Sequence, residues 1–107
     1  MTEVRKLWTA ELPPLPEEDL ARIGALCPGE YYQICACFWL FRYLHGFPLP
    51  RAVLLGDYCF GRFSHHLAAL DDVALTNAFA AYLKNDTLNG SSLPAYLAFI
   101  RDASGAG

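Results

Sequence analysis

Apolar residues recur three or four positions apart along most of the chain, which is the spacing of amphipathic helices. No segment keeps for long the strict apolar–polar alternation that marks a half-buried strand. The pattern therefore predicts an all-α fold of about five helices. They are expected at about 17–26, at about 30–44, at 50–70, from Asp71 to just before Asn85, and from Ser91 or Ser92 to about residue 102.

Residue types with known positional preferences mark the ends of these helices. Three acidic residues at 17–19 fill a first turn, where the helix dipole favours negative charge. Pro50 suits the first turn of the third helix, and Ser91 or Ser92 can cap the last helix, with Pro94 near its start. Breaks are expected at 27–29, at 46–48, and in a loop marked by Asn85-Asp86 and Asn89-Gly90.

Composition divides the chain into three parts. Residues 1–16 are expected to form a Pro-rich N-terminal arm, 17–102 a single helical domain, and 103–107 a flexible tail of Gly, Ala and Ser. The segment 9–16, TAELPPLP, contains a PxxP-like run of the kind that SH3 domains bind. We favour the simpler interpretation, which is an extended arm that lies on the domain.

The apolar content is high for a chain of 107 residues. Hydrophobic residues make up 54% of the sequence, and the mean hydropathy is +0.21. A domain of this size buries only about 60–65% of the surface of its unfolded chain. The expected helix at 30–44 is apolar almost all the way round, and aromatic residues make up 14% of the chain. We therefore expect some apolar surface to bind another protein.

Charge and hydropathy argue against several kinds of partner. The net charge is −3 and the sequence contains no basic run, which argues against nucleic-acid binding. No stretch reaches the roughly 18 apolar residues that a membrane span needs. The first residues, MTEVRKLW, lead into polar and Pro-rich sequence rather than the apolar core of a signal peptide, so we expect a cytoplasmic protein.

The residues that could carry chemistry each have a structural explanation. His65 and His66 are adjacent and would point in different directions from a helix, and Asp71-Asp72 stands where it can cap one. We expect no catalytic residue and no metal site. An alternative in which the chain is a Cys/His metal protein would require stoichiometric metal in the purified chain. The cysteines, which lack zinc-site spacing, are Cys27, Cys35, Cys37 and Cys59.

The expected helix at 50–70 carries an unexplained charge. Asp57 lies next to Gly56 and four residues before Gly61. Each glycine costs a helix about 1 kcal/mol relative to alanine, so we expect another helix to approach closely at both. Asp57 is expected to be a buried anchor at this crossing, and its partner is Arg42, His45 or a group on another subunit.

The stretch RAVLLGDYCFGRFSHHLAAL and the following DDVALTNAFAAYL resemble one part of the all-helical trans-polyprenyl diphosphate synthases. A long helix of that family carries the pattern A-x-L-x-G-D-x-L-x-x-x-A/F, and YLHG at 43–46 resembles the end of the helix before it. The resemblance covers roughly residues 30–85. The positions that stand in the pattern are Ala52, Leu54, Gly56, Asp57, Phe60, Arg62 and Phe63.

The chain departs from this family where the family binds metal. An aspartate-rich DDxxD motif normally follows the histidine, whereas here GFPLP follows His45. The resemblance therefore implies a truncated isoprenoid-synthase-like helical bundle that serves as the non-catalytic small subunit of a heteromeric synthase of the hexaprenyl or heptaprenyl type. On this interpretation the chain is no enzyme on its own and holds no cofactor, and the catalytic large subunit binds Mg²⁺.

The resemblance also implies an interface with that large subunit. In the family, the helix with Gly-Asp and its neighbour pack between subunits. A homodimer of the isolated chain stays open. The alternative is a small helical interaction module, or a self-associating one, that is unrelated to isoprenoids. The residues expected at the interface are Gly56, Asp57, Phe60, Phe63, Trp39 and Phe79.

Overall fold

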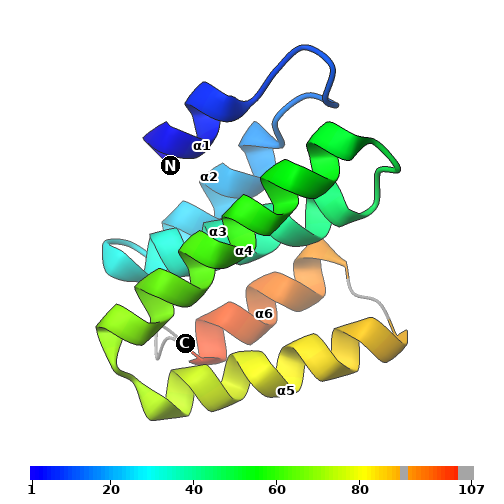
Figure 1. The fold of residues 1–107 in the computed structure, drawn as a ribbon. Helices are drawn as coiled ribbons and strands as arrows, with labels where there is room; N and C mark the ends of the chain where they lie inside the picture. The colour runs from blue at the N-terminus through cyan, green and yellow to red at the C-terminus, as the bar shows by residue number, and fades with distance from the viewer. Residues whose placement is uncertain (90–91, 104–107) are drawn as a thin grey trace.

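The computed structural model describes the backbone of residues 1–89 and 92–103. Within these two ranges the chain forms helices and no strand, so the all-α prediction is confirmed (Figure 1). Ser91 lies outside the described residues, and so does the predicted tail except for Ala103, which ends the last helix. The helices are α1 (Thr2–Leu7), α2 (Glu17–Leu26), α3 (Glu30–His45), α4 (Pro50–Leu70), α5 (Val73–Asn89) and α6 (Leu93–Ala103).

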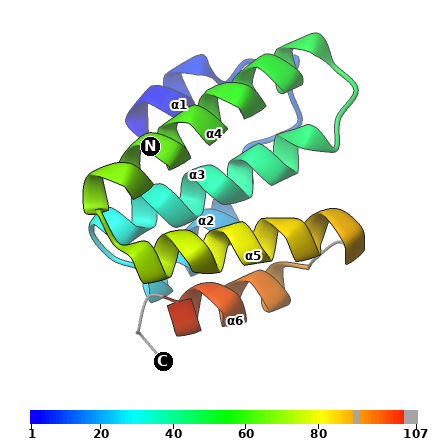
Figure 2. The same cartoon turned by 60° about the horizontal axis from the view of Figure 1, so that its bottom comes forward.

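The central element is α3. Seven consecutive residues of this helix, 34–40, are buried, which covers every direction around the helix axis. Figure 2 shows α3 in the middle of the molecule, with α4 on one side and α5 and α6 on the other. The all-round apolar pattern of this segment therefore reflects burial within the chain itself.

The helices α3 and α4 follow one another in sequence and pack along most of their length (Figures 1 and 2). A Cβ atom added at Gly56 would lie 3.5 Å from Cβ of Leu44 and 3.8 Å from the carbonyl oxygen of Phe41. The helix contact that we expected at Gly56 is present, and a Cβ atom there would make ordinary van der Waals contact with α3. This contact places the first half of α4 against the last turns of α3.

Aromatic rings fill the space between α3 and the C-terminal helices. The Phe38 ring centroid lies 5.1 Å from that of Phe63 on α4 and 5.2 Å from that of Phe79 on α5. Tyr96 of α6 stacks on both Phe38 and Trp39, at 5.8 and 4.9 Å between centroids. Offset and tilted ring pairs of this kind add about 0.5–1.5 kcal/mol beyond the burial of their area.

Polar side chains fix the register of the outer helices against α3. The buried hydroxyl of Tyr96 donates a hydrogen bond to the Cys35 carbonyl oxygen at 2.6 Å. The Trp39 Nε1–H donates to the Asp19 carboxylate of α2 at 3.1 Å. These bonds remove the cost of burying polar groups and allow one alignment of each helix pair.

The N-terminal helix α1 was missed by the prediction of a Pro-rich arm over 1–16. Its Val4 is fully buried, and its Arg5 forms an ion pair with Glu17 of α2. The amino group of Met1 donates to the Gln33 side chain at 3.1 Å. A helix of six residues is too short to form by its own propensity, so contacts with the rest of the fold hold it. Residues 9–16 are not helical, as expected.

The predicted loop at Asn85-Asp86 was wrong, because α5 continues to Asn89. Asp86 is buried and forms an ion pair with Arg42 of α3, which holds the end of α5 in place. The start of α5 follows the expected capping, since the Leu75 N–H donates to the Asp72 carboxylate at 2.9 Å. Tertiary contact outweighs local turn preference at the C-terminal end of this helix.

The Arg42–Asp86 ion pair gives an asymmetric test of the fold. The Asp86 side chain is 6% exposed and its Oδ1 has no hydrogen-bond partner, whereas the Arg42 side chain is 22% exposed. Arg42→Leu leaves a buried carboxylate unpaired, so we expect it to lower the free energy of unfolding by about 3 kcal/mol. Asp86→Leu should cost about 1 kcal/mol, because Arg42 can then turn to water.

Denaturant unfolding of both single variants and of the double Leu variant measures these differences. The double variant should be more stable than Arg42→Leu alone, because no unpaired charge remains. An Arg42→Leu variant no less stable than Asp86→Leu would contradict this account of the ion pair.

Candidate functional site

Large exposed apolar side chains gather on α4 and beside it. Among the side chains whose exposure the structure describes there are six. Five lie on the first three turns of α4, in the loop just before it, or at the end of α1, and the sixth, Val73, begins α5. Exposed apolar groups that cluster in this way mark interaction surfaces more often than single ones do. The five, with their exposed fractions, are Leu7 (42%), Leu49 (39%), Val53 (50%), Leu54 (67%) and Tyr58 (37%).

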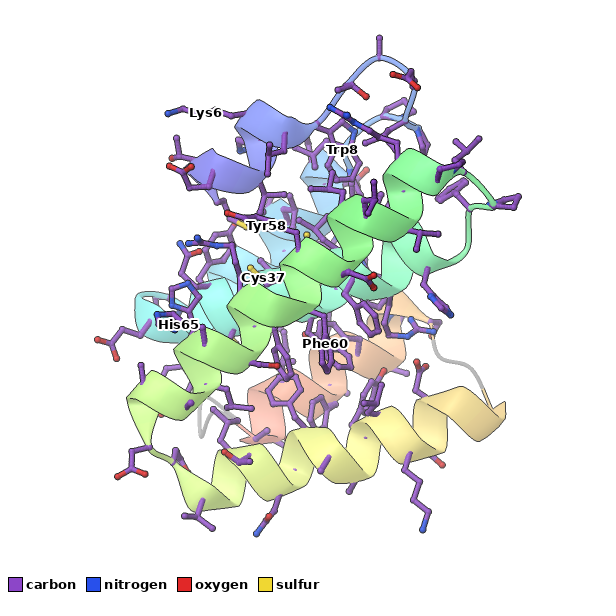
Figure 3. All side chains as sticks on the ribbon, viewed as in Figure 1. Lys6, Trp8, Cys37, Tyr58, Phe60 and His65 are labelled. Atoms are coloured by element: carbon purple, nitrogen blue, oxygen red, sulfur yellow. The ribbon has the colours of Figure 1, made fainter. Side chains whose placement is uncertain are left out.

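A shallow hollow of about 190 Å³ lies within this cluster. Leu7 of α1 forms one side, and Leu54, Leu55 and Tyr58 of α4 form the other, with Arg51 at the rim. Figure 3 shows Tyr58 and His65 on the side of α4 that faces α1, and Phe60 on the opposite side. The hollow therefore lies between α1 and the edge of α4 that carries Tyr58.

Four of the six predicted interface residues belong to the core of this chain. Trp39, Phe63 and Phe79 are 8, 5 and 2% exposed, and Gly56 is buried against α3. The three rings pack within the aromatic cluster, where Phe63 and Phe79 contact each other directly, and all four residues have almost no surface to offer a partner. The interface itself stays a prediction, and the placement limits it to Asp57, Phe60 and the residues around them.

The expectation that Asp57 is a buried anchor was wrong. Asp57 is exposed in this chain, and Arg42, one of the three partners considered for it, binds Asp86 of α5. A partner on another subunit stays a prediction. Successive residues of a helix point about 100° apart. Gly56 therefore faces α3, and Asp57 points away from this contact. An exposed carboxylate needs no counterion, because water solvates it.

Gly61 also differs from expectation. A Cβ atom added at Gly61 would have no neighbouring heavy atom within 4 Å, whereas we expected another helix to approach there. The residue is exposed and lies in the middle of α4. Nothing within the described part of the chain therefore requires glycine at this position.

A second surface lies on the other side of α4, beside Phe60. The half-buried Phe60 ring lies 4.8 Å from the ring of Phe41 on α3. Next to Phe41 is a hollow of about 300 Å³ lined by residues of α3 and α5, including His45 and the Arg42–Asp86 ion pair. This surface offers an aromatic floor, a hollow and a polar rim to another molecule.

The histidines form no catalytic arrangement. His65 is exposed, while His66 is half-buried with Nε2 3.3 Å from an Arg62 guanidinium nitrogen. Burial, the Arg62 charge and His65 lower the pKa of His66, so its ring is neutral at neutral pH. Ser64 is exposed on the same helix and is not held in place as a nucleophile beside either ring.

The four cysteines are buried free thiols. Burial raises the pKa of Cys59 to about 12, and a hydrogen bond with Cys27 together with burial raises the pKa of Cys35. Such thiols stay protonated at neutral pH and act as small apolar core residues. Among the described residues, no group of three or more His, Cys, Asp or Glu side chains could hold a metal ion.

Sequence reasoning missed the outer residues of α4, above all Leu54 and Tyr58. The signal was present, because the buried stripe of this helix passes through Leu55 and Cys59, each one position further on. Apolar residues that fall outside the buried stripe of a helix are candidates for a surface contact.

Comparison with known proteins gives no match: no protein-family model, no curated protein and no solved structure is similar to the chain. None of the described helices is long and apolar enough to cross a lipid bilayer.

Gly61 gives a direct test of its role within the monomer. Alanine favours a helix interior by about 1 kcal/mol over glycine, and no atom of the chain would clash with its Cβ. We expect Gly61→Ala to raise the free energy of unfolding by about that amount in dilute protein, and the reverse change Ala80→Gly on exposed α5 to lower it similarly. A destabilised Gly61→Ala monomer would show that glycine is needed inside the fold.

Proposed function

We propose that this chain is the non-catalytic small subunit of a heteromeric polyprenyl diphosphate synthase and acts in the cytoplasm. The observation that carries the proposal is the pairing of α3 and α4 at Gly56 and Leu44. These are the two helices whose sequences, YLHG and the Gly-Asp pattern, resemble consecutive helices of the synthases. Segments that resemble neighbours in the family are thus neighbours in this fold.

The segment between these helices supports a role without catalysis of its own. Residues 46–50 are GFPLP, with no carboxylate where the family carries its aspartate-rich motif. Carboxylate oxygens are the ligands that Mg²⁺ takes when it binds substrate diphosphates. The catalytic large subunit would therefore supply the metal, the diphosphate sites and the chemistry, and this chain would stabilise the active shape of that subunit.

The surface beside Phe60 suits contact with the large subunit. Asp57 and His45 are exposed there, and the rings of Phe41 and Phe60 are half-buried. An interface typically combines such an aromatic centre with a polar rim. The buried Trp39, Phe63 and Phe79 would act by holding the Phe60 surface in shape.

Co-expression with a DDxxD-bearing polyprenyl synthase encoded near the gene tests this proposal. We expect the two proteins to co-purify, and prenyl transfer with Mg²⁺ to require both. His45→Glu puts a new charge at the rim of the hollow and should reduce both co-purification and activity at least about tenfold. Ala80→Glu, on the exposed face of α5, is the matched control and should change neither.

Two results would contradict the proposal. One is robust prenyl transfer by the purified chain alone with Mg²⁺. The other is a chain that ignores the synthase in co-expression and leaves the activity of that synthase unchanged.

A small self-associating or interaction module unrelated to isoprenoids is the second candidate. The observation that favours it is the exposed apolar cluster around Leu54, which lies outside the surface beside Phe60. This candidate predicts that the chain binds a protein without affecting any prenyl synthase.

A further inference from the structure

The outer face of α4 is bordered by α1 only near Leu54 and Tyr58, and its residues are exposed. Its residues fall three and four positions apart on the side opposite the buried stripe, and α4 lies at the front of the molecule in Figure 1. We define the outer face of α4 by seven exposed residues: Leu54, Asp57, Tyr58, Gly61, Ser64, His65 and Ala68.

The side chains of this face are large toward the N-terminal end of α4 and small toward its C-terminal end. Leu54 lies seven residues before Gly61, and Ala68 lies seven residues after it. Tyr58 precedes Gly61 by three residues, and Ser64 follows it by three. Two copies of α4 placed antiparallel about Gly61 would therefore set each large side chain opposite a small one.

Charge follows the same symmetry. Asp57 lies four residues before Gly61 and His65 four residues after it, and both are exposed. The antiparallel arrangement places the Asp57 carboxylate of one copy across from the His65 ring of the other, twice. An imidazole N–H can donate to a carboxylate in either protonation state of the ring, and the pair is strongest when the ring is charged.

Glycine at the centre then has a physical reason. Gly61 has no neighbour within its own chain, yet it costs helix stability. At a two-fold axis the two Gly61 residues would face each other, and the absence of Cβ atoms lets the backbones approach closely. We infer that the outer face of α4 binds the same face of a second copy, antiparallel, with the two-fold axis at Gly61.

The area of this contact sets its strength. A helix of 21 residues is roughly 30 Å long, and a stable dimer buries about 800 Å² on each partner. One pair of crossing helices supplies less than that, even with Leu7 of α1 beside Tyr58. The dimer is therefore weak and reversible, as is typical of contacts smaller than a standard interface.

The inference does not depend on the proposed function, because it concerns the purified chain alone. The second copy uses the Leu54–Ala68 side of α4, whereas the large subunit was assigned to the side with Phe60 and His45. The two surfaces meet at Asp57. A dimer that forms in a chain without any prenyl synthase partner supports the inference and leaves the proposed function to its own test.

Sedimentation velocity of the purified chain, from low micromolar to several hundred micromolar, measures the dimer. His65→Glu sets two carboxylates against each other and should weaken dimerisation at least about tenfold. Asp57→Lys combined with His65→Glu restores opposite charges and should return the dissociation constant to within about threefold of the unmodified chain. Both positions are exposed, so the helical circular dichroism signal should not change.

Cross-linking locates the axis. Gly61→Cys places one accessible thiol from each copy at the two-fold axis, while the four native cysteines are buried. Mild oxidation should link most of this variant as a dimer, whereas Ala80→Cys on exposed α5 should stay largely monomeric. A chain that is monomeric at several hundred micromolar, a dimer unaffected by His65→Glu, or equal cross-linking of the two cysteine variants would overturn the inference.

Discussion

The structure depends on the burial of α3 on every side. Its residues 34–40 have no exposed direction, so α1, α2, α4, α5 and α6 are arranged as a cover around one apolar helix. A chain of 107 residues has few elements with which to do this, and each helix is needed. The short α1 and the long α5 depend on contacts with the rest of the fold rather than on their own helix propensity. Val4 of α1 is buried, and Asp86 of α5 forms an ion pair with Arg42 of α3.

This arrangement decides which residues are left for a partner. The aromatic side chains around Phe38 pack between α3 and the C-terminal helices, so most of the aromatic content belongs to the core. The residues left for a partner lie on the two flanks and the outer face of α4. This helix covers α3 with one side only. The half of α4 that is not used for the core is apolar near Leu54 and small near Ala68. A partner-binding role for this chain therefore centres on α4.

Much of the fold could be predicted from the sequence, because apolar spacing and capping residues act locally. The limits of α2, α3 and α4 followed from acidic first turns, Pro50 and the breaks after them. Features that depend on distant contacts could not be predicted in this way: α1 needs Glu17 and Gln33, and the end of α5 needs Arg42. For the candidate site, a helix contact at Gly56 was predicted correctly, but it is made with α3 of the same chain, whereas Gly56 was expected at the interface with a partner. Asp57 and Gly61 were misplaced because a one-residue step around a helix separates a buried position from an exposed one.

The central claim is that α3 is the fully covered helix on which the other helices pack. Native-state hydrogen exchange tests it most directly, because amides that open only by global unfolding report the most stable part of a fold. We expect the amides of 34–40 to exchange most slowly, with a free energy equal to that of global unfolding, and those of α1 to exchange by local opening. Exchange in α3 as fast as in α1, or slowest exchange in an outer helix, would contradict it.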